Sequence, residues 1–515
     1  MRMHQAFGCL PLILSSCMTA GIQGGSNAND RSTGGNQGEP LLTGAMVVSP
    51  DGKYAIAQRN QTTVLVDFLA KTAHEMPVTI ERFVFSKTGE HGFAVLADHR
   101  TLIAYDLKTQ AELWRTAPSL QSASGPTLER LTDDDRLLVL GDQDRLLVLD
   151  AQTGRTSGNI AVGSVPTELS FVPGTSTAIV LGTTRWNNHQ PQTDLIDVNL
   201  VSRAHSDTVI PNCSAPIVLN PTGTRAFVSP TFCEEGKASG TGSPWTNPDP
   251  VSVIDIAAES PSFLKNLPGF GPVAMDESGS RVIAYLDVER MDASMFDDVT
   301  QVPAVTGPRY HILTIDPVSL TYELTPIGDL LPRFVLTKDG HTLLVDATVQ
   351  MIRGEAKVEA TIDTSGHFTV DAKLFGSISY QLGLFDTLTQ RYDAVTGAAA
   401  SLDRFVQLGD AASVFSLKMT ADGLGGDLYR IDMSSKSATA MGTSLRDIGL
   451  LADNKTLVLR ERLPAVQVTT SAGSSWYRRE QFCLSADGVV CQVSIEFQDS
   501  VPFQTGPTCT SYHDC

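Results

Sequence analysis

Short apolar segments that end in Asp recur along most of the chain. Each has four to six residues, is rich in Leu, Val and Ile, and has the length and composition of a β-strand. An Asp at the end of a strand accepts hydrogen bonds from the N–H groups of the turn that follows, so we expect these side chains to be structural. The segments end at or next to Asp67, Asp106, Asp150, Asp197, Asp255, Asp316, Asp386 and Asp432.

A two-stranded pattern precedes each of these segments. Examples are MVVSPDGKYAIA, FVFSKTGEHGFAVL and IVLNPTGTRAFVS, in which Gly or Asp marks a turn between apolar stretches. The repeating unit is therefore three or four short antiparallel strands, and no amphipathic helix interrupts the series. Such units at intervals of 39 to 70 residues predict a β-propeller, in which strand sets stack around an axis. We expect an all-β fold with eight blades of four strands, and seven or nine blades stay open.

The segment after the last Asp-ended strand has three interpretations. IGLLADNKTLVLRE, at 448–461, has the pattern of another hairpin, and WYRREQFCLSADGVVCQVSIEF follows it. The segment is a ninth blade, a cap, or the source of an inner strand for the first blade. Because the first hairpin begins at Ala45 with no strand before it, we expect a C-terminal strand to close the ring there.

One stretch resembles a known family of repeats. Residues 146–182, LLVLDAQTGRTSGNIAVGSVPTELSFVPGTSTAIVLG, are similar to the YVTN-type (WD40-like) β-propeller repeat in the Asp-ended strand, the T-x-G turn, the Val-Gly strand end and the x-x-Pro step. The same pattern is weaker at 47–71 and 216–229. The resemblance extends over roughly residues 45–440. It implies the propeller fold and no particular activity, because propellers host unrelated functions.

A second repeat type appears once. LIAYDLKTQAELWR, at 102–115, is similar to the quinoprotein-type repeat with its terminal Trp, which is Trp114 in this chain. A quinone enzyme of that family would have Trp at this place in most blades. Since only Trp114 is in register, we expect no quinone cofactor.

Four insertions break the regular spacing and predict a raised rim. They occupy residues 183–192, 229–250, 287–310 and 347–378, and we place them between the third strand and an Asp-ended fourth strand. Equivalent loops of successive blades emerge on one face, and functional residues concentrate on such loops. Exposed aromatic and Met side chains favour binding of a protein or glycan. In the alternative, the loops pack on one another. The rim candidates are Trp186, His189, Trp245, Met291, Met295, Phe296 and Tyr310.

The first forty residues indicate export and a lipid anchor. Residues 1–16, MRMHQAFGCLPLILSS, have a basic start, a short apolar stretch and small residues, as in a secretory signal peptide. Leu14-Ser15-Ser16-Cys17 resembles a bacterial lipobox, which implies acylation of Cys17, and Met18 then favours the outer membrane. In the alternative, the protein is secreted without acylation. Residues 17–40 predict a flexible tether with a reach of roughly 25–30 Å.

In the remaining chain we expect a propeller at 41–500 and a tail at 501–515.

An even number of Cys residues in an exported chain suggests disulfides. Sequence neighbours pair best, although six Cys allow fifteen pairings. The preferred pairs are Cys213–Cys233, Cys483–Cys491 and Cys509–Cys515.

Composition narrows the partners. The chain has 38 Lys and Arg against 57 Asp and Glu, a net charge of −19, which disfavours nucleic acid. No apolar run reaches the roughly 18 residues of a membrane-spanning helix. Lipobox and propeller together resemble the scaffold lipoprotein of the outer-membrane barrel-assembly machine, although the repeats do not match closely enough to transfer residues. We expect a monomer held at the membrane by lipid, with an envelope protein or a glycan as partner.

Catalytic motifs are absent from the sequence. It contains no GxSxG elbow and no HExxH zinc motif, and its His residues are spread over different blades. Asp297 and Asp298, in an insertion, are weak candidates for a loosely bound Ca²⁺. The leading hypothesis is a binding scaffold without catalysis. The alternative is a metal-dependent propeller hydrolase or lactonase with an axial site.

Overall fold

The computed structural model consists of β-strands that pair almost entirely antiparallel. None of the described residues forms a helix long and apolar enough to cross a membrane. The structure describes Glu39–Pro40 and residues 46–498 except for gaps at 60–61, 189, 230–249, 257–260, 277, 289–295, 297–299, 301, 305–306, 329–332, 338, 352–355, 363–367, 375–377, 398–403, 410–411, 420–424, 471–472 and 489.

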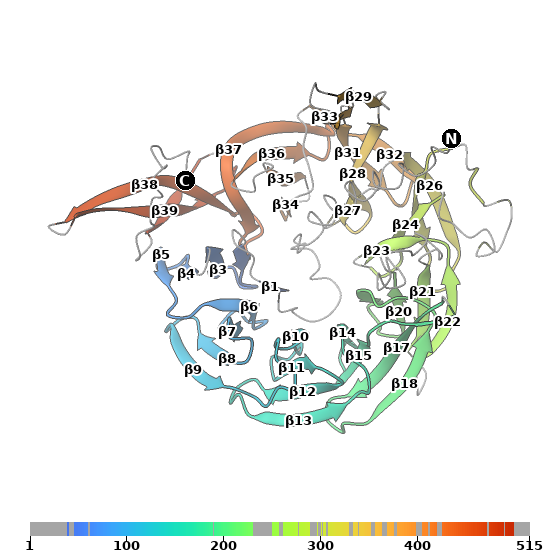
Figure 1. Ribbon diagram of the computed structural model, residues 1–515, viewed down its shortest axis with the longest axis horizontal. Helices are drawn as coiled ribbons and strands as arrows, with labels where there is room; N and C mark the ends of the chain where they lie inside the picture. The colour runs from blue at the N-terminus through green and yellow to red at the C-terminus, as the bar shows by residue number, and fades with distance from the viewer. Residues whose placement is uncertain are drawn as a thin grey trace.

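Four consecutive strands form a unit, and the units follow one another around a central axis (Figure 1). The first strand of a unit lies nearest the axis and the fourth lies at the periphery. This arrangement confirms the predicted all-β propeller. Unit 1 has β2 (Met46–Val48), β3 (Tyr54–Arg59), β4 (Thr62–Asp67) and β5 (Thr72–Glu75); unit 2 has β6 (Ile80–Phe85), β7 (His91–Leu96), β8 (Leu102–Asp106) and β9 (Ala111–Thr116), with β1 (Glu39–Pro40) beside β6; unit 3 has β10 (Leu128–Leu131), β11 (Leu137–Asp142), β12 (Arg145–Asp150) and β13 (Thr156–Ala161).

Units 4 to 7 keep this order, and units 4 and 7 add strands between the second and third members. Unit 4 has β14 (Glu168–Phe171), β15 (Thr177–Leu181), β17 (Gln190–Asn199) and β18 (His205–Ile210), with β16 (Arg185–Asn187) paired to β17; unit 5 has β19 (Ile217–Leu219), β20 (Arg225–Val228), β21 (Val251–Asp255) and β22 (Ser262–Leu267); unit 6 has β23 (Phe270–Met275), β24 (Val282–Asp287), β25 (Tyr310–Ile315) and β26 (Tyr322–Gly328); unit 7 has β27 (Arg333–Leu336), β28 (Thr342–Met351), β31 (Ile378–Asp386) and β32 (Arg391–Ala394), with the hairpin β29 (Ala356–Ile362) and β30 (Phe368–Leu374) between β28 and β31.

The C-terminal sheet contains two units that share one strand. Ser437 of β37 pairs with β36, whereas Leu450 of the same strand pairs with β38. Eight sheets of the described chain have four or more strands, which agrees with the eight predicted blades, and the last sheet continues into a ninth four-stranded unit. Unit 8 has β34 (Arg404–Gln407), β35 (Ser413–Met419), β36 (Gly426–Asp432) and the first part of β37 (Ser437–Leu450), with the short β33 (Thr396–Gly397) parallel to β37. Unit 9 has the last part of β37, β38 (Leu457–Thr470), β39 (Gly473–Ser485) and β40 (Val493–Gln498).

The C-terminal segment is therefore a unit of its own. The expectation that it supplies a strand to the first blade is wrong, because β2, β3, β4 and β5 already form a complete sheet. The ring closes by packing of unit 9 against unit 1 rather than by strand exchange. The Cys483–Cys491 disulfide, with 5.4 Å between the Cα atoms, links β39 to the turn that leads to β40, as predicted.

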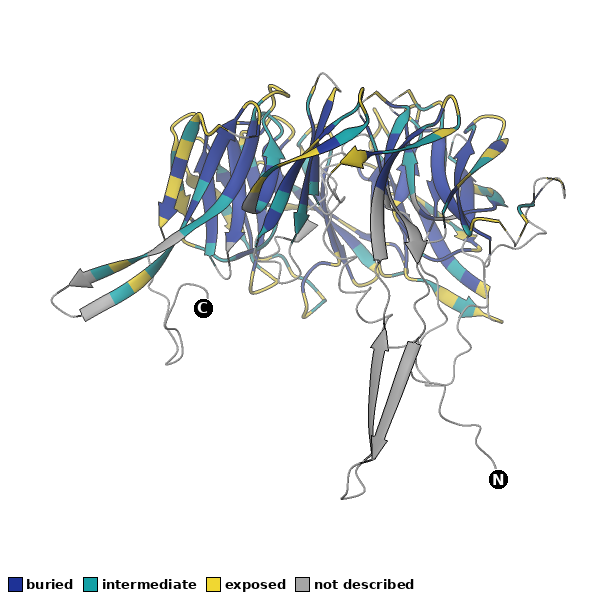
Figure 2. Ribbon diagram, turned by 90° about the horizontal axis from the view of Figure 1, so that it is seen from above, coloured by how far each residue is buried: buried dark blue, intermediate teal, exposed yellow. Residues whose placement is uncertain are grey.

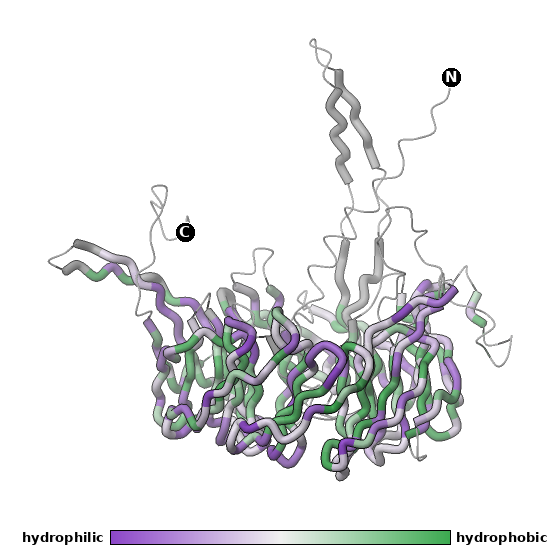
Figure 3. The backbone as a smooth tube through the Cα atoms, turned by 60° about the horizontal axis from the view of Figure 1, so that its bottom comes forward, coloured by the Kyte–Doolittle hydropathy of each residue, from purple (hydrophilic) through white to green (hydrophobic). Residues whose placement is uncertain are grey.

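Apolar side chains between neighbouring sheets form nine clusters among the described residues, one for each pair of successive units. Val84 of unit 2, for example, packs in one cluster with Leu138 of unit 3. The cluster that closes the ring joins Val48 of unit 1 to Phe482 of unit 9. The inner strands of each sheet are covered on both faces and are buried and apolar, whereas outer strands such as β9 and the connecting loops are more exposed and polar (Figures 2 and 3).

A buried polar network reinforces the same seam. The Asp447 carboxylate accepts a hydrogen bond from the Met46 backbone N–H at 2.7 Å. The fully buried Arg460 guanidinium pairs with Glu480 at 2.9 Å and donates to the Gln58 carbonyl at 3.1 Å. These bonds join unit 9 to unit 1 across roughly 400 positions of sequence.

The strand-terminal Asp side chains hold turns, as the sequence predicts. Asp316 Oδ1 accepts hydrogen bonds from the N–H groups of Val318 and Ser319 at 2.8 and 2.9 Å. Backbone and side-chain hydrogen bonds from Ser434 and Ser435 lower the pKa of Asp432 to about 2. The Asp-ended strand is the third strand of its unit and not the fourth as expected, because a further outer strand follows each turn.

Unit 4 departs from this rule. Its turn is held by Asn199, whose side-chain oxygen accepts from Val201 and Ser202 N–H at 3.0 and 2.8 Å. Asp197 lies two residues earlier within β17, where burial raises its pKa. The Asn199 side chain can replace an Asp here because its amide oxygen accepts hydrogen bonds as a carboxylate oxygen does.

Trp114 couples unit 2 to unit 3. Its indole N–H donates to the Ala151 carbonyl at 2.9 Å, and its ring lies 6.1 Å from that of Phe93. The ring also covers Gly154, where a Cβ would lie 2.6 Å from the indole. Trp114, the Trp of the quinoprotein-like repeat, therefore has a packing role between units 2 and 3.

Candidate functional site

The strand order gives the ring two different ends. Each unit begins at one end, turns at the other between its first and second strands, and returns before its third strand. We call the first end the insertion face and the other the turn face. The connections between second and third strands are extended in units 4, 5, 6, 7 and 9, and all of them emerge on the insertion face. Met46, where the chain enters β2, lies on the same face.

The predicted rim residues lie in different surroundings. Trp186, on β16, lines a depression on the insertion face. Phe296 is 7% exposed and packs edge-on against Tyr322, with 6.1 Å between ring centroids, in the core between units 5 and 6. Tyr310 is equally buried between units 6 and 7. The remaining candidates, His189, Trp245, Met291 and Met295, lie outside the described residues, as do Asp297, Asp298, Cys17, Cys233, Cys509 and Cys515.

The Trp186 depression lies between the inner strands of units 4 and 5. It has a volume of about 570 Å³ and opens to solvent. Its wall combines one aromatic ring, one carboxylate and several hydroxyl groups. The lining residues are Thr167, Glu168, Thr183, Thr184, Trp186, Ser214, Ala215 and Pro216.

The hydroxyl groups of this wall donate their protons into the protein. Thr167 Oγ1 donates to the Leu181 carbonyl at 3.1 Å, and Thr183 Oγ1 donates to the Val165 carbonyl at 3.3 Å. Thr167 Oγ1 is also in short contact with Ser214 Oγ, and either hydroxyl can be the donor there. What the Thr167 and Thr183 hydroxyls offer the depression is therefore oxygen lone pairs.

Thr184 also donates its hydroxyl proton within the protein, to the hydroxyl of Thr193. Its Oγ1 accepts from Ser214 N–H at 2.8 Å and lies 3.1 Å from Thr193 Oγ1. Thr193 donates its own proton to the Asn212 carbonyl at 2.7 Å, so the proton between the two hydroxyls comes from Thr184. The fully buried Asn212 side chain donates to the Pro250 carbonyl at 2.8 Å and fixes the floor.

The β16–β17 hairpin positions the Trp186 ring. Arg185 and Asp194 form a bidentate ion pair across this hairpin, with distances of 2.6 and 2.9 Å. Planar pairs of this kind fix geometry as well as charge. Cys213, beside the floor, is disulfide-bonded, and its predicted partner lies outside the described residues.

Charged side chains continue from the depression along the inner strands. Glu168 keeps 24% of its side chain exposed and has a long ion-pair contact of 3.8 Å with Arg130. The neighbouring Glu129 is fully buried, and neither of its carboxyl oxygens accepts a hydrogen bond from the described residues. Burial raises the pKa of Glu129 to about 8, against a smaller lowering by Arg82 and Arg130.

A two-stranded arm leaves unit 9. Val466–Thr470 of β38 and Gly473–Tyr477 of β39 pair only with each other among the described strands. Figures 1 and 2 show β38 and β39 extending away from the ring. Trp476, opposite Gln467, is 38% exposed on this arm. An isolated ribbon of two strands is only marginally stable in water.

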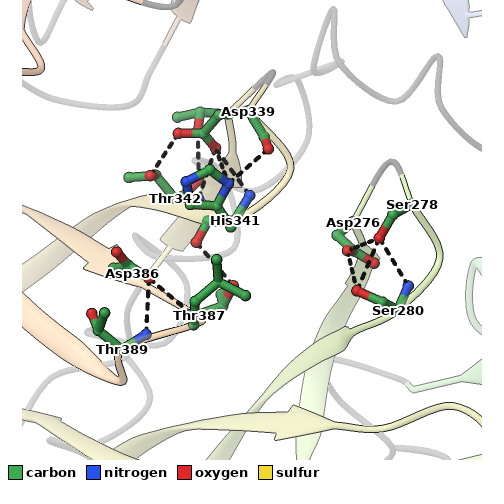
Figure 4. A network of polar contacts seen from close by, with 11 residues as sticks. Asp276, Ser278, Ser280, Asp339, His341, Thr342, Asp386, Thr387 and Thr389 are labelled. Carbon is green, nitrogen blue, oxygen red and sulfur yellow. Dashed lines mark hydrogen bonds and ion pairs between the residues drawn. The ribbon is translucent and has the colours of Figure 1, made fainter.

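A second depression, of about 390 Å³, lies on the turn face between units 6 and 7 (Figure 4). Its first carboxylate is Asp276, which accepts hydrogen bonds from Ser278 and Ser280 hydroxyls at 2.5 and 2.7 Å. It also accepts from the Arg281 N–H at 2.7 Å. These bonds hold the turn between β23 and β24.

The facing carboxylate, Asp339, is used in the same way. It accepts from the N–H groups of His341 and Thr342 at 2.9 and 2.8 Å, and Thr387 donates to the His341 carbonyl at 2.8 Å. Burial works to raise the pKa of Asp339, but hydrogen bonds from Thr337 and Thr342 outweigh it and lower the pKa. We interpret this depression as two turns side by side.

Metal-binding residues do not gather in the part of the chain that the structure describes. No three His, Cys, Asp or Glu side chains come together there in a way that could hold an ion. His311 is buried on β25, where burial lowers its pKa. The axial metal of the hydrolase alternative thus has no candidate ligand set among these residues.

Sequence reasoning found Trp186 and missed its neighbours. Glu168 and Ser214 are more than forty positions apart and meet only because units 4 and 5 are adjacent. No short motif marks them. The repeat could have indicated that these residues are neighbours, because Thr167 and Ser214 both lie just before the first strand of their units.

Comparisons with known proteins find similarity to solved structures alone, at low identity. No family model matches the sequence, and no curated protein does. The solved structures that resemble the chain include a eukaryotic initiation factor, with 10% identity over 78% of this chain and 87% of that one and a TM-score of 0.48. The propeller of Dos1 has 10% identity over 83% and 90%, with a TM-score of 0.39. The β-propeller domain of Cps50 (Swd1) from Myceliophteria thermophila has 11% identity over 73% and 91%, with a TM-score of 0.33.

Proposed function

We propose that the protein is an exported, lipid-anchored propeller that binds a partner at the cell envelope through its insertion face. One observation carries the proposal. Units 4, 5, 6, 7 and 9 all lengthen the same connection, which gathers the extra residues on one end of a closed ring. Loops held by a rigid scaffold need little further ordering when they bind.

The N-terminal segment supports the orientation. A lipid on Cys17 holds the chain at a membrane, and the tether that follows enters the ring at Met46, on the insertion face. The bound partner is then a molecule that reaches the membrane surface. The several acyl groups of a bacterial lipoprotein hold such an anchor firmly.

Site-specific photo-crosslinking tests the proposal. A photoreactive phenylalanine analogue at Trp186 or Trp476 places the probe on the insertion face or the arm. The matched controls are Leu69 and Val318, which are 69% and 79% exposed in turns of the turn face. We expect a discrete crosslinked partner from the first two positions in cells and none from the controls. Equal crosslinking from both sets, or none from Trp186 and Trp476, contradicts the proposal.

Export and acylation have their own measurement. Mass spectrometry of the membrane fraction is expected to find a mature chain that begins at acylated Cys17. The Cys17→Ala variant is expected to leave that fraction. An uncleaved, unacylated chain in the membrane fraction contradicts the lipid anchor.

A further inference from the structure

We propose that the Trp186 depression accepts an arginine or lysine side chain from a basic segment of the partner protein. This inference rests on the proposed binding function and names the chemistry that the partner presents. It follows from three properties of the wall: the direction of its hydroxyl protons, its charge, and its aromatic ring.

The hydroxyl groups favour a ligand that donates hydrogen bonds. Thr167 and Thr183 donate to backbone carbonyls, and Thr184 donates to Thr193. The lining residue Pro216 has no N–H group. A ligand that can only accept finds few donors on such a wall, whereas a guanidinium or ammonium group consists of donors.

Charge favours a cation among the possible donors. The Glu168 carboxylate lines the depression with 24% of its side chain exposed. Arg130 lies behind it, is 8% exposed, and is not a lining residue. The whole chain carries a net charge of −19, so the field of the protein at long range and the local carboxylate both attract a cation.

The aromatic ring adds a surface for the same group. A guanidinium stacks on an indole face and at the same time forms a planar pair with a carboxylate. Trp186 and Glu168 line one depression, and the Arg185–Asp194 ion pair and the buried Asn212 hold its walls. The site is therefore ordered before binding, which limits the entropy lost when a side chain enters.

The test uses the mature full-length protein and a peptide with four arginines separated by Gly-Ser. A peptide with citrulline in place of arginine keeps the shape and removes the charge. Glu168→Gln is expected to weaken binding of the arginine peptide at least about tenfold, since it removes a charge-assisted hydrogen bond. Trp186→Ala is expected to weaken it roughly three- to thirtyfold, and Trp186→Phe less.

A matched control separates this site from general attraction to an acidic surface. Glu90→Gln removes one negative charge from the turn between β7 and its preceding strand, on the turn face. It is expected to leave binding within about twofold, and thermal unfolding confirms that each variant is folded.

Several results overturn the inference. They are equal binding of the citrulline peptide, equal losses in Glu168→Gln and Glu90→Gln, no binding of the arginine peptide, and a Trp186-dependent affinity for a neutral tetrasaccharide in its place. The crosslinking experiment above decides the binding function separately. If a partner crosslinks at Trp186 but Glu168→Gln leaves its capture unchanged, the function stands and the cationic ligand is wrong.

Discussion

The carboxylate of Asp447 receives the backbone N–H of Met46 at 2.7 Å, which ties the innermost strand of the last unit to that of the first. The two residues are 401 positions apart. Arg460 makes a second connection beside it, to the carbonyl of Gln58. Buried, charge-assisted hydrogen bonds therefore stabilise the junction between units 9 and 1, which no connecting segment of the chain spans.

Arg460→Met is expected to destabilise the protein by about 3–5 kcal/mol, since it leaves Glu480 buried with less compensation and removes the donor to Gln58. Chemical denaturation followed by circular dichroism measures this. The control is Arg115→Met, which breaks the exposed pair of Arg115 with Glu112 and is expected to cost far less stability, because solvent screens exposed pairs. Equal effects of the two substitutions contradict a structural role for the seam network.

Glu129 predicts a pH dependence of stability. Its carboxyl group has a pKa of about 8 in the folded protein against an ordinary 4.5, so between these values the folded state holds a proton that the unfolded state has lost. Stability therefore falls as the pH rises across this window, by roughly 3 kcal/mol at pH 7.

Glu129→Gln removes that titration. We expect the variant to gain stability relative to the natural protein as the pH rises from 5 to 8. Denaturation curves at several pH values, with Glu90→Gln as the control, measure the difference. A difference that stays constant over this range shows that the carboxyl group is not protonated in the folded state.

Gly154→Ala tests the packing of the Trp114 ring between units 2 and 3. The added Cβ meets the Trp114 indole at 2.6 Å, and the backbone φ of +67° disfavours any side chain. Gly174→Ala is a matched control, because its φ is +70° and nothing lies within 4 Å of the new atom. We expect the control to cost about 1 kcal/mol and Gly154→Ala to cost clearly more, as measured by thermal unfolding. Similar losses show that Trp114 does not pack as described.

Replacing residues 464–478 by a two-residue Asn-Gly turn, which connects the paired residues Leu463 and Arg479, tests whether the arm belongs to the ring. The arm pairs only with itself among the described strands, so the truncated protein is expected to keep its fold and most of its stability. A cooperative loss of the β-sheet signal at room temperature contradicts this description of the arm.

The sequence predicts the propeller because its local signals and its global packing agree. Turns such as Ser49-Pro50-Asp51-Gly52 and the Asp that ends β12 each act within a few residues. The ninth unit is harder to read, because β39 ends in Ser485 and not in Asp, and because β37 passes from one unit to the next without a turn. Periodicity cannot show where one long strand changes its partner.

The candidate site is less accessible to sequence analysis for a different reason. Trp186 stands in an insertion and attracts attention as an exposed aromatic residue. Phe296 stands in a comparable insertion, yet its ring fills the core beside Tyr322. Whether an inserted aromatic side chain faces solvent or core depends on the neighbouring unit, which no local pattern encodes.

The central claim is that unit 9 closes the ring against unit 1. Spin labels at Leu69 and Val490, which are 69% and 59% exposed in turns of units 1 and 9, measure this seam by double electron–electron resonance. The reference pair is Val318 and Leu388, in the corresponding turns of the adjacent units 6 and 7. A closed ring predicts a seam distance as short and as narrowly distributed as the reference. A broad or much longer distribution across the seam alone contradicts the closed ring.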